Sequence, residues 1–287
     1  MHEPARVVRD VSYAHSAETR GGRAMIRAME NLTGRIGLIK RARGYEDEVA
    51  AGRDFWQVMA DRYGLSLEVV QGRLDAIPRK GPLILIANHP YGILDGLMMG
   101  HILSHTRGDF RILANSVFRK AEELNRFILP VSFDETHAAI ATNLETRRRS
   151  LDFLGEGGAI GIFPGGAVAT SAKPFSRPMD PGWRGFTARM VAKSDATVVP
   201  LFFDGQNSRL FQVASHLHQT LRLGLLIKEF GRRVDTPVRV HIGQPLGRDL
   251  LDPLSRDPKS LMEFLRHKTY ELSPTPVDSR SVGFEWD

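Results

Sequence analysis

The stretch Leu83-Ile-Leu-Ile-Ala-Asn-His-Pro-Tyr-Gly-Ile-Leu-Asp-Gly96 joins a short apolar run to a turn-forming segment that carries two ionisable side chains. The run Leu83–Ala87 is apolar on both faces, which is typical of a strand buried in a sheet that helices cover on each side. Open α/β sheets place their sites at the carboxyl ends of such strands. His89 and Asp95 follow this strand directly, so they are the first functional candidates.

Segments around this stretch alternate between strand and helix patterns. Further strands are expected at Phe110–Ala114, Ala159–Phe163, Val198–Phe203 and Val238–Ile242. Helices are expected at Gly96–His105, Ala138–Leu154, Gly185–Lys193 and Lys259–Tyr270. This alternation predicts an α/β class: a single domain with a largely parallel mixed sheet flanked by helices. We place this domain at residues 76–273, after a helical N-terminal extension (1–75) and before a C-terminal tail (274–287).

Composition excludes several kinds of chemistry. The 287 residues include no Cys, which rules out disulfides, thiolate metal sites and a cysteine nucleophile. A net charge of +6 favours a polyanionic partner, namely nucleic acid, an anionic membrane surface or an acidic carrier protein. No RNA-binding or base-reading motif accompanies this charge, so we expect no nucleic-acid partner. The polar opening of the chain predicts no secretory signal, and the apolar runs are too short to span a bilayer.

Positive charge is concentrated in Arg20–Arg43, where seven basic residues accompany the single acid Glu30. Apolar residues recur at helical spacing within this segment, at Met25, Ile26, Met29, Leu32, Ile36 and Ile39. Such a basic amphipathic helix suits the surface of an anionic membrane. An ordinary docking helix with a solvated basic face is the alternative.

Several familiar motifs are absent or out of place. No Gly-x-Ser-x-Gly nucleophile elbow occurs. The glycine-rich run at Gly155–Gly161 precedes a strand rather than following one, so it is a turn and not a dinucleotide fingerprint. His101, His105 and Asp109 share a helical face, but nothing else nearby completes a metal site, and we expect no metal.

His89 is the side chain best suited to move a proton near neutral pH. Asp95 is placed to accept from the other ring nitrogen and to stabilise the imidazolium, as in a catalytic triad whose nucleophile is the substrate. The residues between them would form the turn that brings the carboxylate back to the ring. A polar turn capped by Asp95 is the alternative.

Four further blocks follow His89 and Asp95 in order: Arg111-Ile-Leu-Ala-Asn-Ser-Val-Phe-Arg119, Ile162-Phe-Pro-Gly-Gly166, Trp183-Arg-Gly-Phe186 and Val198-Val-Pro-Leu201. Together with Asn88–Asp95, they resemble the motifs of the glycerolipid (lysophospholipid) acyltransferase superfamily, from about Ile77 to Leu246. There are three departures. Five residues rather than four separate His89 from Asp95, Gly165 replaces the third-block Glu, and the second-block Arg has no counterpart in Phe127–Ser132. The longer spacing, with Asp204–Phe211, resembles the bacterial hemolysin-like branch, which includes acyltransferases of ornithine and related amino-acid lipids.

The resemblance implies an O-acyltransferase that moves a fatty acyl group from an acyl thioester, on acyl carrier protein or coenzyme A, to a lysolipid hydroxyl. It implies that His89 takes the hydroxyl proton and that Asp95 orients His89. Neither a covalent acyl-enzyme nor a resident cofactor is needed. We expect the enzyme to be cytoplasmic and peripheral on the inner face of the cell membrane.

The expected substrate-binding residues are Asn88, Gly92, Phe163, Pro164, Gly165, Gly166, Lys173 and Arg184. Backbone N–H groups around Gly165 and Gly166 are the expected donors to the tetrahedral oxyanion. Lys173, Arg177 and Arg184 are candidate contacts for an anionic headgroup or the donor's phosphopantetheine, with a solvated surface as the alternative for each.

The acceptor prediction depends on the missing side chains. In the superfamily, the third-block Glu and the second-block Arg are associated with glycerol phosphate acceptors. Losing them implies a different polar head, and Gly165 should leave more room beside the thioester. We therefore expect a lyso-amino-acid lipid such as lyso-ornithine lipid. The alternatives are a 1-acylglycerol-3-phosphate acyltransferase and a non-catalytic membrane-surface binding protein of the same fold.

Overall fold

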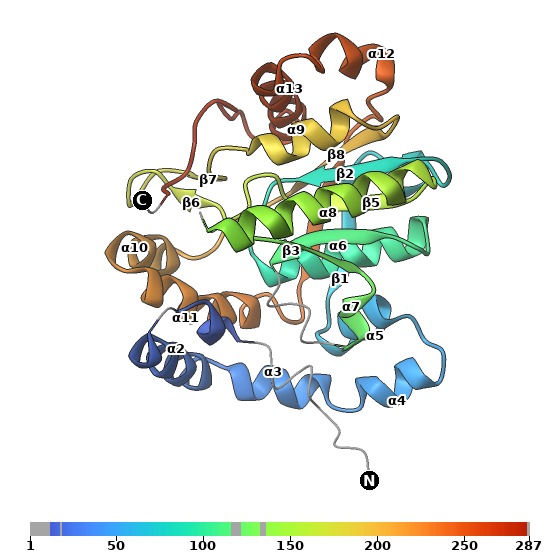
Figure 1. The fold of residues 1–287 in the computed structure, drawn as a ribbon. Helices are drawn as coiled ribbons and strands as arrows, with labels where there is room; N and C mark the ends of the chain where they lie inside the picture. Colours follow the sequence, from blue (N-terminus) through green and yellow to red (C-terminus); the bar gives the residue numbers. More distant parts are fainter. Residues whose placement is uncertain (1–11, 18, 116–121, 133–135, 286–287) are drawn as a thin grey trace.

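A seven-stranded sheet with strand order β1-β9-β8-β2-β5-β3-β4 lies at the centre of the computed structural model (Figure 1), which describes residues 12–17, 19–115, 122–132 and 136–285. Its strands are β1 (Ser66–Gln71), β2 (Leu83–Ala87), β3 (Arg111–Asn115), β4 (Ile128–Val131), β5 (Ala159–Ile162), β8 (Thr197–Phe203) and β9 (Pro237–Ile242). The β8–β9 pair is antiparallel and the other pairs are parallel. A separate antiparallel pair joins β6 (Thr170–Ser171) to β7 (Pro178–Met179). The expected largely parallel mixed sheet is confirmed.

Helices connect the strands. They are α2 (Arg20–Leu32), α3 (Arg35–Ala42), α4 (Tyr45–Ala50), α5 (Phe55–Arg62), α6 (Ile93–Thr106), α7 (Glu122–Asn125), α8 (His137–Gly155), α9 (Gly185–Ala192), α10 (Arg209–Leu217), α11 (Gln219–Gly231), α12 (Arg248–Leu251) and α13 (Pro258–Tyr270), with 3-10 turns at Tyr13–Ser16, Leu74–Ala76 and Asp252–Leu254. None of the helices in the described ranges is long and apolar enough to cross a membrane.

Strand β2 is the middle strand of the sheet, and all five of its residues are buried. It pairs in parallel register with β5 on one side and β8 on the other. Leu83 and Leu85 face the core that contains residues of α5 and α6. Ile84 and Ile86 face a second core, which contains residues of α8, α9 and α13. The two cores lie on opposite faces of the sheet (Figure 1), as the doubly apolar pattern predicts.

The N-terminal extension is more broken, and it joins the sheet more closely, than its sequence pattern predicts. Gly34 has φ 121°, a left-handed conformation that favours glycine, and it separates α2 from α3. Ser66–Gln71, placed in the extension by the sequence analysis, forms the outermost strand β1 and pairs with β9. Strand β4 and helices α10 and α11 were not expected from the sequence.

The basic helix α2 packs through part of its apolar face. Ile26 is fully buried, and a Cβ atom added at Gly224 of α11 would lie 2.9 Å from the sulfur of Met29. Other apolar side chains of α2 and α3 point into solvent, with exposed fractions of 53% for Met25, 86% for Leu32 and 50% for Ile36. These helices therefore dock on the domain and still present apolar side chains outward.

Candidate active site

His89 and Asp95 lie together at the carboxyl end of β2. The His89 Nδ1 atom lies 2.9 Å from the Asp95 Oδ2 atom. The Asp95 side chain is fully buried, whereas the His89 side chain is 17% exposed. A buried carboxylate at the inner nitrogen of a partly exposed imidazole can fix its tautomer and stabilise its protonated form.

Asp95 also holds the turn that separates it from His89. Its Oδ2 atom accepts from the backbone N–H groups of Tyr91 (2.8 Å) and Gly92 (3.0 Å). Gly92 is the residue before α6 and has φ 94°, so a side chain there would be strained. The turn therefore holds one residue more than the superfamily motif, and the Asp95 carboxylate still lies beside the His89 ring.

The main chain of His89 is held from a distant segment. Its carbonyl accepts from the Ala169 N–H (2.8 Å), and its N–H donates to the Asp180 Oδ1 atom (3.0 Å). Phe163 stacks on the imidazole, with ring centroids 4.3 Å apart and planes 26° from parallel. Residues that follow β5 thus fix both the backbone and the ring of His89.

Gly165 and Gly166 lie in the turn after β5. The Gly166 N–H donates to the Phe163 carbonyl (3.0 Å), so this donor is already used within the turn. The Gly165 N–H therefore remains the candidate oxyanion donor of the two. A Cβ atom added at Gly165 would lie 3.2 Å from the Asp180 Cβ atom and 3.3 Å from Pro181, so a side chain there would be tightly packed. That Gly165 leaves more room beside the thioester than Glu would remains a prediction.

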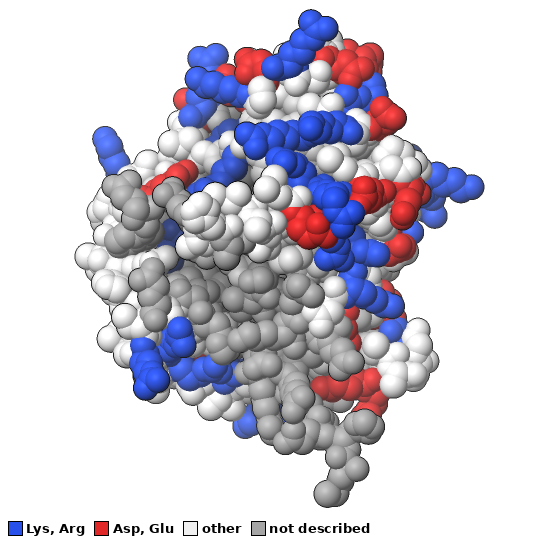
Figure 2. All heavy atoms as spheres, in the orientation of Figure 1, with Lys and Arg blue, Asp and Glu red and all other residues white. Residues whose placement is uncertain are grey.

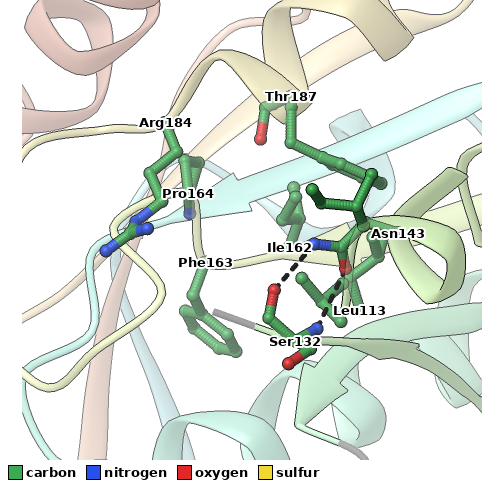
Figure 3. A pocket seen from close by; sticks show the side chains of 11 residues that line it. Leu113, Ser132, Asn143, Ile162, Phe163, Pro164, Arg184 and Thr187 are labelled. Carbon is green, nitrogen blue, oxygen red and sulfur yellow. Dashed lines mark hydrogen bonds between the residues drawn. The ribbon is translucent and has the colours of Figure 1, made fainter. Parts of the chain in front are cut away.

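A cavity of about 310 Å³ lies next to the His89–Phe163 stack. Figure 3 shows Asn143 of α8 bonded to the backbone of Ser132, which follows β4. The lining is largely apolar and is formed by Leu113, Val131, Ser132, Ile140, Asn143, Ile162, Phe163, Pro164, Arg184, Phe186 and Thr187. Phe163, Pro164 and Arg184 of the expected binding residues therefore line one apolar cavity.

Asn88 and Gly92 have structural roles that do not require a substrate. Asn88 is 4% exposed, and its side-chain amide donates to the Phe203 carbonyl (2.9 Å) and accepts from the Phe203 N–H (2.7 Å). These bonds link the end of β2 to β8 and give Asn88 a structural role, while a substrate contact of Asn88 remains a prediction. Gly92 is buried, and a Cβ atom added there would meet the Tyr13 hydroxyl and Val168, each at 3.2 Å.

The candidate cations are dispersed. Lys173 is exposed in the turn between β6 and β7 and is not among the cavity's lining residues. Arg177 donates to Ser273, Thr275 and Pro276 and so anchors the C-terminal segment. Arg184 alone of the three lines the cavity.

Asp180 is the site residue that the sequence analysis missed. It is fully buried, and burial raises the pKa of its carboxyl group. Its second oxygen accepts from the Trp183 Nε1–H (3.0 Å). In the sequence it stands before Pro181 and Gly182 like any turn aspartate, so nothing in the pattern marks it.

Within the described residues, no group of three or more His, Asp or Glu side chains could hold a metal ion. Asp109 pairs with Arg111, and His105 Nδ1 contacts the His101 carbonyl at 2.8 Å. The second block runs from Arg111 to Arg119, and its last four residues, 116–119, lie outside the described residues.

Comparison with known protein families identifies the family of this chain. The acyltransferase family model matches residues 44–278. The chain belongs to this family. It is 24% identical over 235 residues to a lyso-glycine lipid O-acyltransferase of Phocaeicola vulgatus, covering 77% of this chain and 78% of the relative. It is 22% identical over 241 residues to a lyso-glycine lipid O-acyltransferase of Bacteroides thetaiotaomicron, covering 79% and 82%.

Among solved structures, this acyltransferase is similar to the 1-acyl-sn-glycerophosphate acyltransferase PlsC from Thermotoga maritima. The match has 16% sequence identity and a TM-score of 0.43, and it covers 77% of this chain and 84% of that one.

Proposed function

We propose that this acyltransferase moves a fatty acyl group from an acyl thioester to the hydroxyl of a lyso-amino-acid lipid. The observation that carries the chemistry is the 2.9 Å approach of His89 to the buried Asp95 at the end of β2. The names of two relatives, both lyso-glycine lipid O-acyltransferases, support the acceptor class. Lyso-glycine and lyso-ornithine lipids are the acceptors to test first.

In the proposed mechanism, the neutral His89 accepts the proton of the acceptor hydroxyl as its oxygen attacks the thioester carbonyl. Asp95 stabilises the imidazolium that forms. The Gly165 N–H donates to the oxyanion of the tetrahedral intermediate. Collapse of the intermediate breaks the C–S bond, and the imidazolium returns its proton to the leaving thiolate. General-base catalysis of this kind contributes about 10²–10⁴-fold.

The cavity beside Phe163 suits a fatty acyl chain, because most of its lining residues are apolar. The acyl thioester donor enters from the surface of the protein. Both acyl carrier protein and coenzyme A carry negative charge. Figure 2 shows a row of Lys and Arg side chains where Figure 1 places α9, and Lys and Arg interspersed with Asp and Glu where it places α8. Arg149, Arg189 and Lys193 of these helices and the turn after α9 are exposed. This positive surface supports an acidic donor.

Membrane docking is proposed for α2 and α3. Their outward Met25, Leu32 and Ile36 supply apolar contacts, while exposed basic residues such as Arg20 and Lys40 supply attraction to anionic lipid. We expect Leu32→Asp to weaken binding to anionic vesicles, with binding also falling as salt rises. Arg35 is unsuitable for this test because it is buried beside Glu30.

The chemistry is tested by assaying acyl transfer and vesicle binding in His89→Ala. We expect turnover to fall by at least about a hundredfold, with vesicle binding unchanged. Near-normal turnover would contradict the mechanism, and wild-type protein that binds vesicles without any acyl transfer would favour the binding-protein alternative.

Competition between lyso-glycine lipid, lyso-ornithine lipid and lysophosphatidic acid, read by mass spectrometry, tests the acceptor. A clear preference for lysophosphatidic acid would overturn the acceptor class and leave the acyl transfer standing.

A further inference from the structure

The backbone of His89 is tied to a second buried carboxylate, which belongs to a different part of the chain from Asp95. The Asp180 Oδ1 atom accepts the His89 N–H at 3.0 Å, and Oδ2 accepts the Trp183 Nε1–H at 3.0 Å. Both oxygens therefore have a donor, and Asp180 is fully buried. A buried carboxylate held by two N–H groups has a narrow choice of orientations.

The position of Asp180 is itself fixed by the C-terminal part of the chain. Its N–H donates to the Tyr270 hydroxyl (3.0 Å), and its carbonyl accepts from the Arg266 guanidinium (3.1 Å) and the Gly283 N–H (2.9 Å). Helix α13 therefore fixes the backbone of Asp180, while the carboxylate remains free to serve His89 and Trp183. The backbone of Asp180 is thus bonded to the C-terminal part of the chain, and its carboxylate is bonded to His89 and Trp183.

Asp180 also closes the site beside the proposed oxyanion donor. Its Cβ atom lies 3.2 Å from where a Cβ atom at Gly165 would stand. One side chain thus borders the turn that carries the oxyanion donor and holds the residue that carries the base. Any shift of Asp180 moves these two groups relative to each other, and errors of about 1 Å in such placements cost about a hundredfold in rate.

We propose that Asp180 is a positioning residue of this acyltransferase. Its carboxylate, which accepts one N–H group at each oxygen, sets the position of His89 relative to the turn that contains Gly165. The proposal rests on the proposed function in one respect, namely that His89 is the base. It predicts that the charge and both oxygens of Asp180 matter for turnover and not for substrate binding.

Asp180→Asn is the informative substitution. The His89 N–H and the Trp183 Nε1–H bond to different oxygens of Asp180, and an amide has an oxygen at only one of these two positions, so Asn cannot accept at both. We expect kcat to fall at least tenfold, with KM for donor and acceptor within about threefold of wild type. Trp183→Phe removes the competing donor, so the Asp180→Asn/Trp183→Phe double variant should recover part of the lost kcat. Glu263→Gln, at an exposed position of the same helix α13, is the control and should keep kcat within about twofold.

A second measurement does not depend on turnover. In protein labelled with ¹⁵N-histidine, exchange of the His89 amide hydrogen should be at least tenfold faster in Asp180→Ala than in wild type, and unchanged in Glu263→Gln. Unchanged exchange in Asp180→Ala would overturn the proposal, and so would Asp180→Asn with a normal kcat or with a raised KM alone. If wild-type protein showed no acyl transfer, the proposed function would fail, while the exchange measurement would still decide whether Asp180 holds His89. If Asp180→Asn does not fold, Trp183→Phe alone should lower kcat, because it frees one side of the carboxylate.

Discussion

Replacing Asp95 by Asn should separate its catalytic role from its structural one. Its Oδ2 atom receives two backbone N–H groups, from Tyr91 and Gly92, and lies 2.9 Å from His89 Nδ1. In Asp95→Asn, the amide oxygen is expected to stay on the two backbone donors, because the amide nitrogen cannot accept from them. The turn should therefore persist, while the imidazolium loses its counter-charge.

The size of the effect follows from that distance. Two unit charges 2.9 Å apart attract each other by about 6 kcal/mol at an effective dielectric constant of about 20. The amide dipole recovers part of this energy, so we expect kcat to fall by about 10²–10⁴-fold, the upper end matching the loss seen when a triad aspartate becomes asparagine. Asp95→Ala should lose the turn bonds as well, with a further loss of about 1 kcal/mol in the free energy of unfolding.

The assay is steady-state transfer from an acyl thioester to a lysolipid, read by mass spectrometry, with thermal unfolding measured on the same samples. Asp95→Asn should unfold close to wild type and turn over far more slowly. Turnover within about threefold of wild type would refute the assignment of Asp95 as the partner of the base. A collapse of stability in Asp95→Asn equal to that of Asp95→Ala would refute the separation of roles.

Three further outcomes are expected. Gly100→Ala should lower the free energy of unfolding by about 1–3 kcal/mol, because its Cβ atom would lie 2.1 Å from the Trp56 ring. Gly96→Ala in the same helix meets nothing within 4 Å and should raise it by about 0.5–1 kcal/mol; equal melting temperatures would contradict both. Ile140→Trp at the cavity should shift donor preference toward shorter acyl chains in a competition assay, and an unchanged chain preference would show that the chain lies elsewhere. Since burial raises the pKa of Asp180, the stability of wild type relative to Asp180→Asn should be greatest below about pH 4 and should fall as pH rises through the raised pKa; a difference independent of pH in denaturant titrations would count against this shift.

Local patterns in the sequence were sufficient for the strands and helices that surround the catalytic turn. Leu83–Ala87 is apolar at every position, so burial on both faces could be predicted, and β2 is buried throughout. The adjacency of His89 and Asp95 was also predictable, because a short turn between strand and helix limits how far apart they can lie. Strand β4 (Ile128–Val131) was missed because Pro130 interrupts its apolar run, and a proline inside such a run argues against a strand.

The amino-acid sequence by itself predicted the α/β class, a candidate site at the carboxyl end of β2, and the closeness of His89 to Asp95, because all three depend on residues close together in the chain. Folding decided which distant groups complete the site. Asp180 lies 91 positions from His89, and Asn88 uses both sides of its amide on Phe203, 115 positions away. No local periodicity encodes such contacts, because they exist only once β5, β8 and α13 have packed around the central strand. The same packing places Asp180 and Pro181 beside Gly165.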